Sequence, residues 1–157
     1  MFGFIEESRT LVRVDTPQQA AQCGWVLGRF HRLTRDLPPA KLHETLPGFH
    51  VLPTYLQHFE RALGAWSSPV SAELATALAA VEQRRGGADV LERARSEGRI
   101  QVRAIHGDPK LDNILFRKGR EGDHDRALGL VDLDTVQPGL LHYDLGDCLR
   151  SVCNPAG

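Results

Sequence analysis

The sequence lacks a long apolar run, an excess of positive charge and paired cysteines, and each absence excludes a class of protein. No stretch approaches the roughly 20 apolar residues of a membrane-spanning helix, and no basic leader precedes a shorter apolar run. A formal net charge of −1 at neutral pH provides no basic surface that would hold nucleic acid or an anionic membrane. We therefore expect a cytoplasmic protein that binds neither of them.

Cysteine and lysine are both scarce. The three cysteines show no Cys-x-x-Cys spacing, so the sequence predicts neither a disulfide framework nor a thiolate zinc site, and a reducing compartment fits. Lysine occurs only at Lys41, Lys110 and Lys118. The remaining composition, 41% hydrophobic and 25% charged over 157 residues, is that of an ordinary globular domain.

Helical patterns run through the first hundred residues. A capping signal at Thr16 is followed by apolar residues at three- and four-residue steps, which predict a helix to about Arg35. Gly24 and Gly28 within this helix would permit close approach by a neighbouring element. Further amphipathic helices are predicted from Pro53 and from Ser68-Pro69, and a short charged helix with a solvated face is predicted over Ala88 to Ser96.

Strand-like runs surround a polar interruption in the second half of the chain. Two of these runs are separated by a polar turn, so a hairpin is the simplest arrangement. Its open end would bring the segment from Asp108 to Asn113 beside Asp132. The predicted strands are Ile100 to Ile105, Ile114 to Phe116 and Leu128 to Val131, with one or two short strands between Gly3 and Val14.

The polar residues of this region are those that a phosphoryl transfer requires. Asp108 is placed to receive and orient an attacking hydroxyl, and Lys110 offers a compact cation for the charge of the moving phosphoryl group. Asn113 and Asp132 offer hard oxygen ligands of the kind that magnesium prefers. Asp134 would point to the same side of an extended strand as Asp132, so it could also reach the metal or the substrate.

Two other chemistries remain open from the residues alone. A hydrolase with the paired carboxylates Asp108 and Asp132 would leave Lys110 and Asn113 without a role. A metal-dependent hydrolase built on His106 and Asp108 would require further histidines close by.

The segment HGDPKLDN, followed by Val131-Asp132, resembles the catalytic and metal-binding segments of the kinase-like phosphotransferases, the superfamily of aminoglycoside phosphotransferases and choline kinases. The resemblance implies that Asp108 is the catalytic base and that Asn113 and Asp132 bind magnesium. Gly107 stands where protein kinases carry an arginine, and no Asp-Phe-Gly or Ala-Pro-Glu sequence follows. A small-molecule kinase is therefore favoured over a protein kinase.

The resemblance also implies a fold. We expect an α+β chain, corresponding to the mainly helical C-terminal lobe of a protein-kinase-like fold with a small catalytic β-hairpin. Residues 1–14 would form the hinge strand region, and residues 15–157 the C-terminal catalytic lobe, truncated at both ends. No segment resembles the N-terminal lobe, with its phosphate-covering loop and its strand lysine paired to a helix glutamate.

A narrower likeness runs through VDLDTVQPGLLHYDLGDCLRS and, more loosely, GRFHRLTRDLPPAKLHETLPGFH. Both are similar to bacterial N-acetylhexosamine 1-kinases, which phosphorylate the anomeric hydroxyl of an amino sugar. This likeness implies that His106 and Asp144 support the catalytic loop, Asp144 through backbone hydrogen bonds. Asp147 and Arg150 are one helical turn apart and are expected to form a surface ion pair rather than a sugar contact.

The expected activity is transfer of the γ-phosphate of ATP, with Mg²⁺, to a hydroxyl of a sugar or aminoglycoside-like acceptor. The most favoured acceptor is an N-acetylhexosamine, phosphorylated at position 1. The alternative is a truncated or degenerate kinase lobe that acts as a non-catalytic binding module. The sequence carries no signal of oligomeric state.

Since half of the expected nucleotide cleft has no counterpart in the sequence, the isolated 157-residue chain should show little or no phosphoryl transfer. Incubation of the purified chain with labelled ATP, Mg²⁺ and a hexosamine panel measures this directly. Robust turnover would contradict the expectation.

Overall fold

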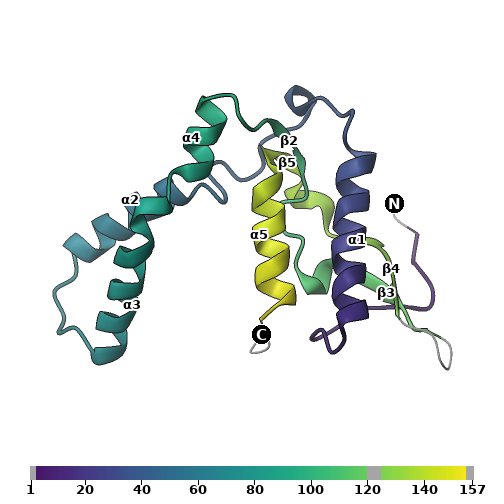
Figure 1. The fold of residues 1–157 in the computed structure, drawn as a ribbon, viewed down its shortest axis with the longest axis horizontal. Helices are drawn as coiled ribbons and strands as arrows, with labels where there is room; N and C mark the ends of the chain where they lie inside the picture. Colours follow the sequence, from purple (N-terminus) through teal and green to yellow (C-terminus); the bar gives the residue numbers. More distant parts are fainter. Residues whose placement is uncertain (1–2, 120–124, 155–157) are drawn as a thin grey trace. The chain divides into compact units, whose positions relative to one another are not determined.

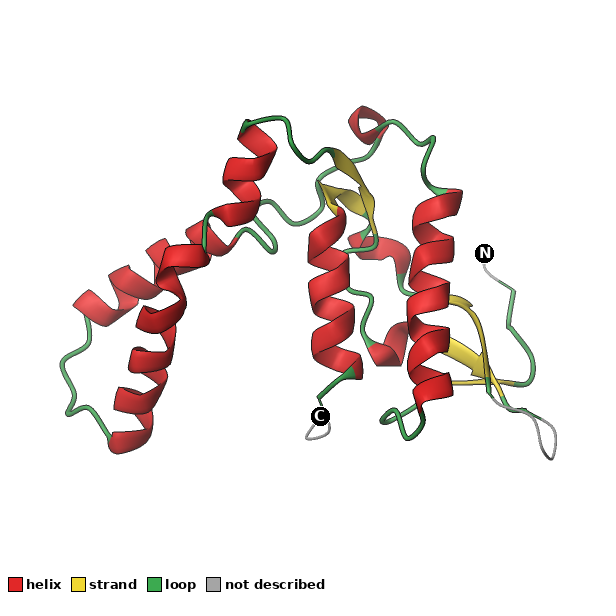
Figure 2. Ribbon diagram, in the orientation of Figure 1, coloured by secondary structure: helices red, strands yellow, loops and turns green. Residues whose placement is uncertain are grey.

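The computed structural model describes residues 3–119 and 125–154, and Figures 1 and 2 show that helices dominate it. None of the helices within these ranges combines the length and the apolar character that crossing a bilayer requires. The helices are α1 (Pro17–Leu33), α2 (Leu52–Gly64), α3 (Ala72–Arg84), α4 (Val90–Ser96) and α5 (Leu141–Val152). The strands are β1 (Ser8–Arg9), β2 (Val102–Ile105), β3 (Ile114–Arg117), β4 (Arg126–Leu130) and β5 (Gln137–Leu140).

The chain divides into two compact units. The first joins residues 1–47 to residues 102–157, and the second consists of residues 48–101. The sequence does not reveal this division, because amphipathic segments of similar composition occur in both units. The first unit combines helices with all the strands of the described chain, which agrees with the predicted α+β class.

Helix α1 begins where the capping signal predicts. The N–H of Gln19 donates to Thr16 Oγ1 at 3.2 Å, and Gln19 Oε1 accepts from the N–H of Asp15 at 2.8 Å. These bonds satisfy backbone donors that the helix itself cannot satisfy in its first turn. The helix ends at Leu33, two residues before the predicted end.

The predicted role of the glycines in α1 is wrong. Gly24 and Gly28 are exposed, and, apart from the chain neighbours and the backbone of α1 itself, no atom of the described chain lies within 4 Å of where a Cβ would stand on either residue. The buried face of α1 is instead made by Cys23, Val26, Leu27 and His31. Helix α5 and strand β4 contact α1, but neither approaches the two glycines closely.

The predicted hairpin is present. Strands β3 and β4 pair in antiparallel orientation with a bulge between Leu115 and Phe116, and β1 adds to the other edge of β3. A two-stranded antiparallel ribbon, β2 with β5, was not predicted. Strand β5 contains Pro138 and Gly139, two residue types that are depleted in strands and common in turns. Between Gly3 and Val14 only the two-residue β1 forms.

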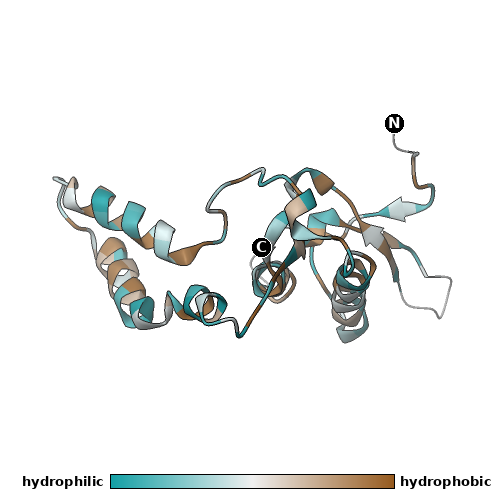
Figure 3. Cartoon of the chain, turned by 90° about the horizontal axis from the view of Figure 1, so that it is seen from above, coloured by the Kyte–Doolittle hydropathy of each residue, from teal (hydrophilic) through white to brown (hydrophobic). Residues whose placement is uncertain are grey.

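The core of the first unit lies between α1, α5 and the β3–β4 hairpin. Figure 1 shows α1 and α5 side by side, and Figure 3 shows that both carry apolar and polar residues. Ile114 and Phe116 of β3 are completely buried in this core. The buried members of the cluster are Leu11, Cys23, Val26, Leu27, Leu111, Ile114, Phe116, Ala127 and Cys148.

The second unit has almost no interior of its own. Ala94 is the one buried residue among residues 48–101, all of which the structure describes, and neither α2 nor α3 buries a residue fully. Helix α3 begins at Ala72 rather than at the predicted Ser68-Pro69, because Ser71 supplies the cap by accepting from the N–H of Leu74 at 3.2 Å.

Phe116→Ala should lower the free energy of unfolding by about 3–5 kcal/mol, because it leaves a large cavity in the core of the first unit. Phe4→Ala is the matched control, since Phe4 is 89% exposed and its loss should change the stability by only about 0.5 kcal/mol or less. Urea denaturation of the three proteins measures both effects. Equal losses in the two variants would contradict this placement of the core.

Candidate active site

The segment from His106 to Asn113 connects the two sheets of the first unit. It follows β2, whose last residues Ala104 and Ile105 are buried, and it leads into the fully buried Ile114 of β3. Its last three residues, Leu111–Asn113, form one turn of 3-10 helix. We call the segment from His106 to Asn113, which contains the predicted catalytic residues Asp108 and Lys110, the catalytic loop. Buried strands hold both of its ends, so its backbone has little freedom to move.

The carboxylate of Asp144 binds the beginning of the loop. Asp144 lies on α5 and is completely buried, as is His106. The N–H of His106 donates to Asp144 Oδ2 at 2.8 Å, and the N–H of Gly107 donates to Oδ1 at 2.9 Å. Two backbone donors thus satisfy both oxygens of a charge that would otherwise be costly to bury.

The imidazole of His106 joins the loop to the end of β4. Its Nε2 lies 3.0 Å from the carbonyl oxygen of Val131, and its Nδ1 lies 3.4 Å from the N–H of Asp108. A neutral ring that carries its proton on Nε2 satisfies both contacts, since it donates to the carbonyl and accepts from the N–H. In addition, Thr135 Oγ1 donates to the carbonyl oxygen of His106 at 2.8 Å.

Gly107 occupies a position that no other residue fits well. Its φ is +87°, and a Cβ would stand 2.6 Å from the carbonyl oxygen of Thr135. A side chain here would therefore meet both the backbone strain of the left-handed region and a clash with main chain.

Asp108, Lys110 and Asn113 form one cluster. Lys110 Nζ donates to Asp108 Oδ2 at 2.6 Å, and this hydrogen bond raises the pKa of the ammonium above its ordinary value, so the lysine is charged at neutral pH. Asn113 Nδ2 donates to the carbonyl oxygen of Asp108 at 2.8 Å and to its Oδ2 at 3.2 Å. The amide of Asn113 therefore fixes both the backbone and the side chain of Asp108.

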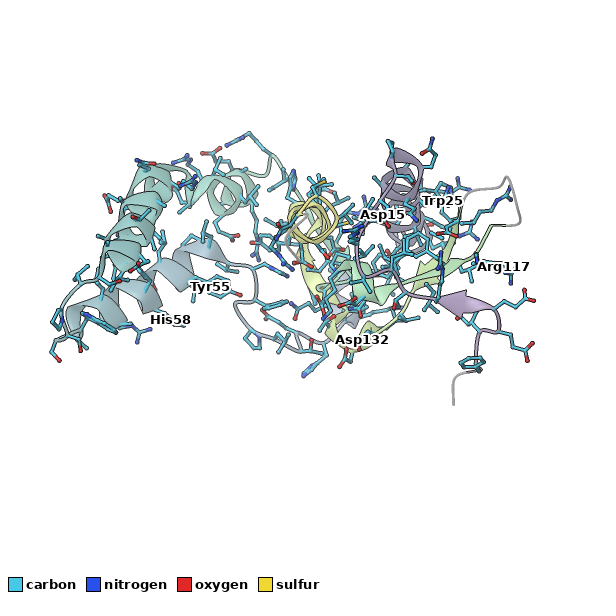
Figure 4. The ribbon with its side chains drawn as sticks, turned by 90° about the horizontal axis from the view of Figure 1, so that it is seen from below. Asp15, Trp25, Tyr55, His58, Arg117 and Asp132 are labelled. Carbon is cyan, nitrogen blue, oxygen red and sulfur yellow. The ribbon has the colours of Figure 1, made fainter. Side chains whose placement is uncertain are left out.

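Asp132 follows β4 and is labelled in Figure 4. The N–H of Val131 donates to the carbonyl oxygen of Asn113 at 2.9 Å, which brings the residue before Asp132 against the end of the catalytic loop. The charge of Asp132 also contributes to raising the pKa of Lys110. Asp132 is exposed and lies within electrostatic reach of the cluster.

The expected geometry of Asp134 is wrong. Strand β4 ends at Leu130, Asp132 adopts the left-handed conformation with a φ of 65°, and Leu133–Thr135 form a 3-10 turn. Side chains two positions apart lie on the same side only in an extended strand. Since Asp132 and Asp134 do not lie in one, their spacing does not place them on the same side. Asp134 is exposed, and no hydrogen bond or ion pair within the described residues joins it to Asp108 or Asn113.

Three supporting residues escaped the sequence analysis. Ser151 of α5 accepts from the N–H of Leu111 at 2.9 Å, and Thr135 anchors His106. His31 of α1 is buried, and its Nε2 lies 3.0 Å from Asp144 Oδ2. The two atoms are not oriented for a hydrogen bond. Helical spacing could have placed His31 on the buried face with Cys23 and Leu27, but nothing local reveals its distant neighbour.

The oxygen atoms of Asn113 and Asp132 suit a divalent cation that the protein and a bound substrate hold together. Within the described ranges there is no group of three or more His, Cys, Asp or Glu side chains that could hold a metal ion. Asn113 Oδ1 accepts no hydrogen bond in the described chain, and Asp132 supplies an exposed carboxylate. Magnesium is commonly held by one or two protein oxygens together with the phosphates of a substrate, so the pair of residues fits this ion.

A family model described as the phosphotransferase enzyme family matches residues 5–157. The match covers nearly the whole chain and includes the catalytic loop, Asp132 and α5.

Gly107→Ala should lower the free energy of unfolding by more than the strain of a left-handed alanine alone, which is about 1–2 kcal/mol. Gly98→Ala is the matched control, because Gly98 has a φ of +70° but, apart from its chain neighbours, no atom lies within 4 Å of a new Cβ. Urea denaturation compares the two variants. If both lose the same free energy, the contact with Thr135 does not constrain the loop.

Proposed function

The chain belongs to the phosphotransferase enzyme family, and on this basis we propose that, as part of a full-length enzyme, it transfers the γ-phosphoryl group of ATP to a hydroxyl of a small acceptor. The acceptor that we favour is an amino sugar, with phosphorylation of the anomeric hydroxyl of an N-acetylhexosamine as the leading case. The kinase-type transfer follows from the family, which uses ATP as the co-substrate. The acceptor rests on the likeness of residues 131–151 to the N-acetylhexosamine 1-kinases.

The cluster of Asp108, Lys110 and Asn113 is the observation that carries the proposal. A phosphoryl transfer depends on positioning and charge stabilisation more than on covalent chemistry. The carboxylate of Asp108 is 24% exposed, so it is held by Asn113 and still reaches solvent. In the proposed reaction Asp108 accepts a hydrogen bond from the acceptor hydroxyl and so orients the hydroxyl oxygen toward the γ-phosphorus. As that oxygen attacks, Asp108 receives the proton of the hydroxyl.

Lys110 has a second role in this proposal. Its ammonium is paired with Asp108 in the free protein and is 39% exposed. The side chain is long enough and accessible enough to turn toward incoming phosphate, where a fully charged ammonium stabilises the negative charge of the transferred group.

Asn113 Oδ1 and the Asp132 carboxylate would hold magnesium, which when bound supplies a positive charge between the phosphates of ATP. The residues of the chain do the rest of the positioning. The amide of Asn113 donates to Asp108 through Nδ2 and keeps Oδ1 available, so one side chain can link the acceptor side of the site to the nucleotide side. Asp134 remains a candidate for a contact with the metal or the substrate.

Asp108→Asn should reduce kcat by about 10²-fold or more, because an amide can neither accept the proton of the acceptor hydroxyl nor supply the negative charge of a carboxylate. The assay follows transfer from γ-labelled ATP to a panel of hexosamines by the protein that the complete gene encodes. Asp112→Asn is the matched control, since Asp112 is an exposed acid in the same loop; it should retain kcat close to that of the unmodified protein.

Retention of near-normal turnover by Asp108→Asn would sink the assignment of the base. Absence of transfer to any acceptor, together with measurable ATP or sugar binding, would favour the alternative of a non-catalytic binding module.

A further inference from the structure

His31 is a buried histidine whose ring makes no hydrogen bond. It lies in the last turn of α1 on the buried face of that helix, and its side chain is only 8% exposed. Neither Nδ1 nor Nε2 has a hydrogen-bond partner within the described residues. A buried polar group without a partner lowers stability, and native structures leave few such groups without a functional reason. A phenylalanine would fill the same place without this cost, so packing alone does not account for a histidine here.

The carboxylate of Asp144 lies within reach of this ring. His31 Nε2 is 3.0 Å from Asp144 Oδ2, which is a hydrogen-bonding distance, and only the orientation of the two atoms prevents a bond. Asp144 is completely buried, and no lysine or arginine of the described ranges forms an ion pair with it. Since a buried carboxylate depends on the donors around it, His31 is suited to be one of them.

Asp144 has room for a further donor. Its Oδ2 accepts from the N–H of His106 at 2.8 Å, and its Oδ1 accepts from the N–H of Gly107 at 2.9 Å. The two oxygens of a carboxylate together accept about four hydrogen bonds, so both of these bonds can remain while Oδ2 accepts a third. His31 lies on α1 and Asp144 on α5, so this third bond would connect both helices to the beginning of the catalytic loop.

The surroundings of the His31 ring leave it free to turn. The ring of Phe30 lies edge-to-face against the rings of both His31 and His106, with 5.5 Å between the centroids of each pair. A groove of about 440 Å³ between α1 and α5 is also lined by His31, together with residues that include Cys23 and Cys148. The last torsion of a histidine side chain has broad minima. A rotation of the ring alone can therefore direct Nε2–H at Asp144 Oδ2.

We propose that His31 is a positioning residue of the catalytic loop, which donates from Nε2–H to Asp144 Oδ2 and so fixes the carboxylate that holds the beginning of the loop. His31 acts through Asp144 rather than on a substrate. Its effect on turnover rests on the proposed function, because a loop with a loose beginning places Asp108 less accurately against the acceptor hydroxyl.

Two substitutions distinguish a hydrogen-bond donor from a residue that only fills space. His31→Phe keeps a ring and removes both nitrogens, whereas His31→Gln places an amide N–H close to the position of Nε2. In the 157-residue chain, amide exchange followed by NMR should be about tenfold faster at His106 and Gly107 in His31→Phe, and within about threefold of the native rate in His31→Gln. The N–H of Ala127, which donates to Gln22 Oε1 at 3.0 Å, is the internal reference and should keep its native rate.

His58→Phe is the matched control, because His58 is an exposed histidine of α2 (Figure 4). It should leave the exchange at His106 and Gly107 unchanged. A second measurement uses only the native chain, so it stands even if His31→Phe does not fold. NMR of the imidazole nitrogens should show a proton on Nε2 of His31, and this proton should exchange slowly with water because it is buried and hydrogen-bonded.

The protein that the complete gene encodes provides the test of turnover. His31→Phe should lower kcat by about tenfold and leave KM for ATP and for the acceptor close to the native values, and His31→Gln should restore most of kcat. A residue that only fills space would show the opposite order, since phenylalanine resembles the imidazole ring more closely than glutamine does.

The proposal is overturned if Nε2 of His31 carries no proton, or if the amides of His106 and Gly107 exchange at the native rate in His31→Phe. It is also overturned if His31→Gln exchanges as fast as His31→Phe, and faster exchange with an unchanged kcat would overturn the role in catalysis. The exchange and imidazole measurements use no substrate. Failure of the full-length protein to phosphorylate any acceptor would therefore reject the proposed phosphoryl transfer, whereas the position of the loop would still be decided by these two measurements.

Discussion

The buried carboxylate of Asp144 is the interaction on which the candidate site depends. Its two oxygens accept from consecutive backbone N–H groups, those of His106 and Gly107, and this forces the chain to turn away from the line of β2. At this turn Gly107 has a positive φ, and a Cβ on it would clash with the carbonyl oxygen of Thr135. A charge buried without solvent must be satisfied by such bonds, so the position of the loop is determined by α5.

The same helix organises the site beyond that contact. One face of α5 carries Asp144 and Ser151, which accept hydrogen bonds from the start of the loop and from its 3-10 turn. The hairpin supplies the other side, since the bond from Val131 to Asn113 places Asp132 next to the loop. By contrast, residues 48–101 bury only Ala94, so most of the apolar packing of the described chain supports the first unit.

Much of the local structure could be predicted from the sequence. The cap at Thr16, the amphipathic helices and the pairing of β3 with β4 depend on neighbouring residues, and the structure contains them. The cluster of Asp108, Lys110 and Asn113 could be predicted because its members lie within six positions of one another. The pairing of β2 with β5 could not, because Pro138 and Gly139 favour a turn when considered alone and form a strand only beside a partner.

The sequence by itself determined the family, the helix starts and the identity of the polar residues in the loop, because these depend on residue type and short spacing. Tertiary structure alone decided which face of α1 is buried and how the chain turns at Asp132. It also decided which carboxylate oxygens of α5 accept a hydrogen bond. Asp147 and Arg150 illustrate the difference. Their spacing predicts a surface ion pair, and the structure contains it. The burial of one carboxylate oxygen of Asp147 depends instead on segments distant in sequence that pack against α5.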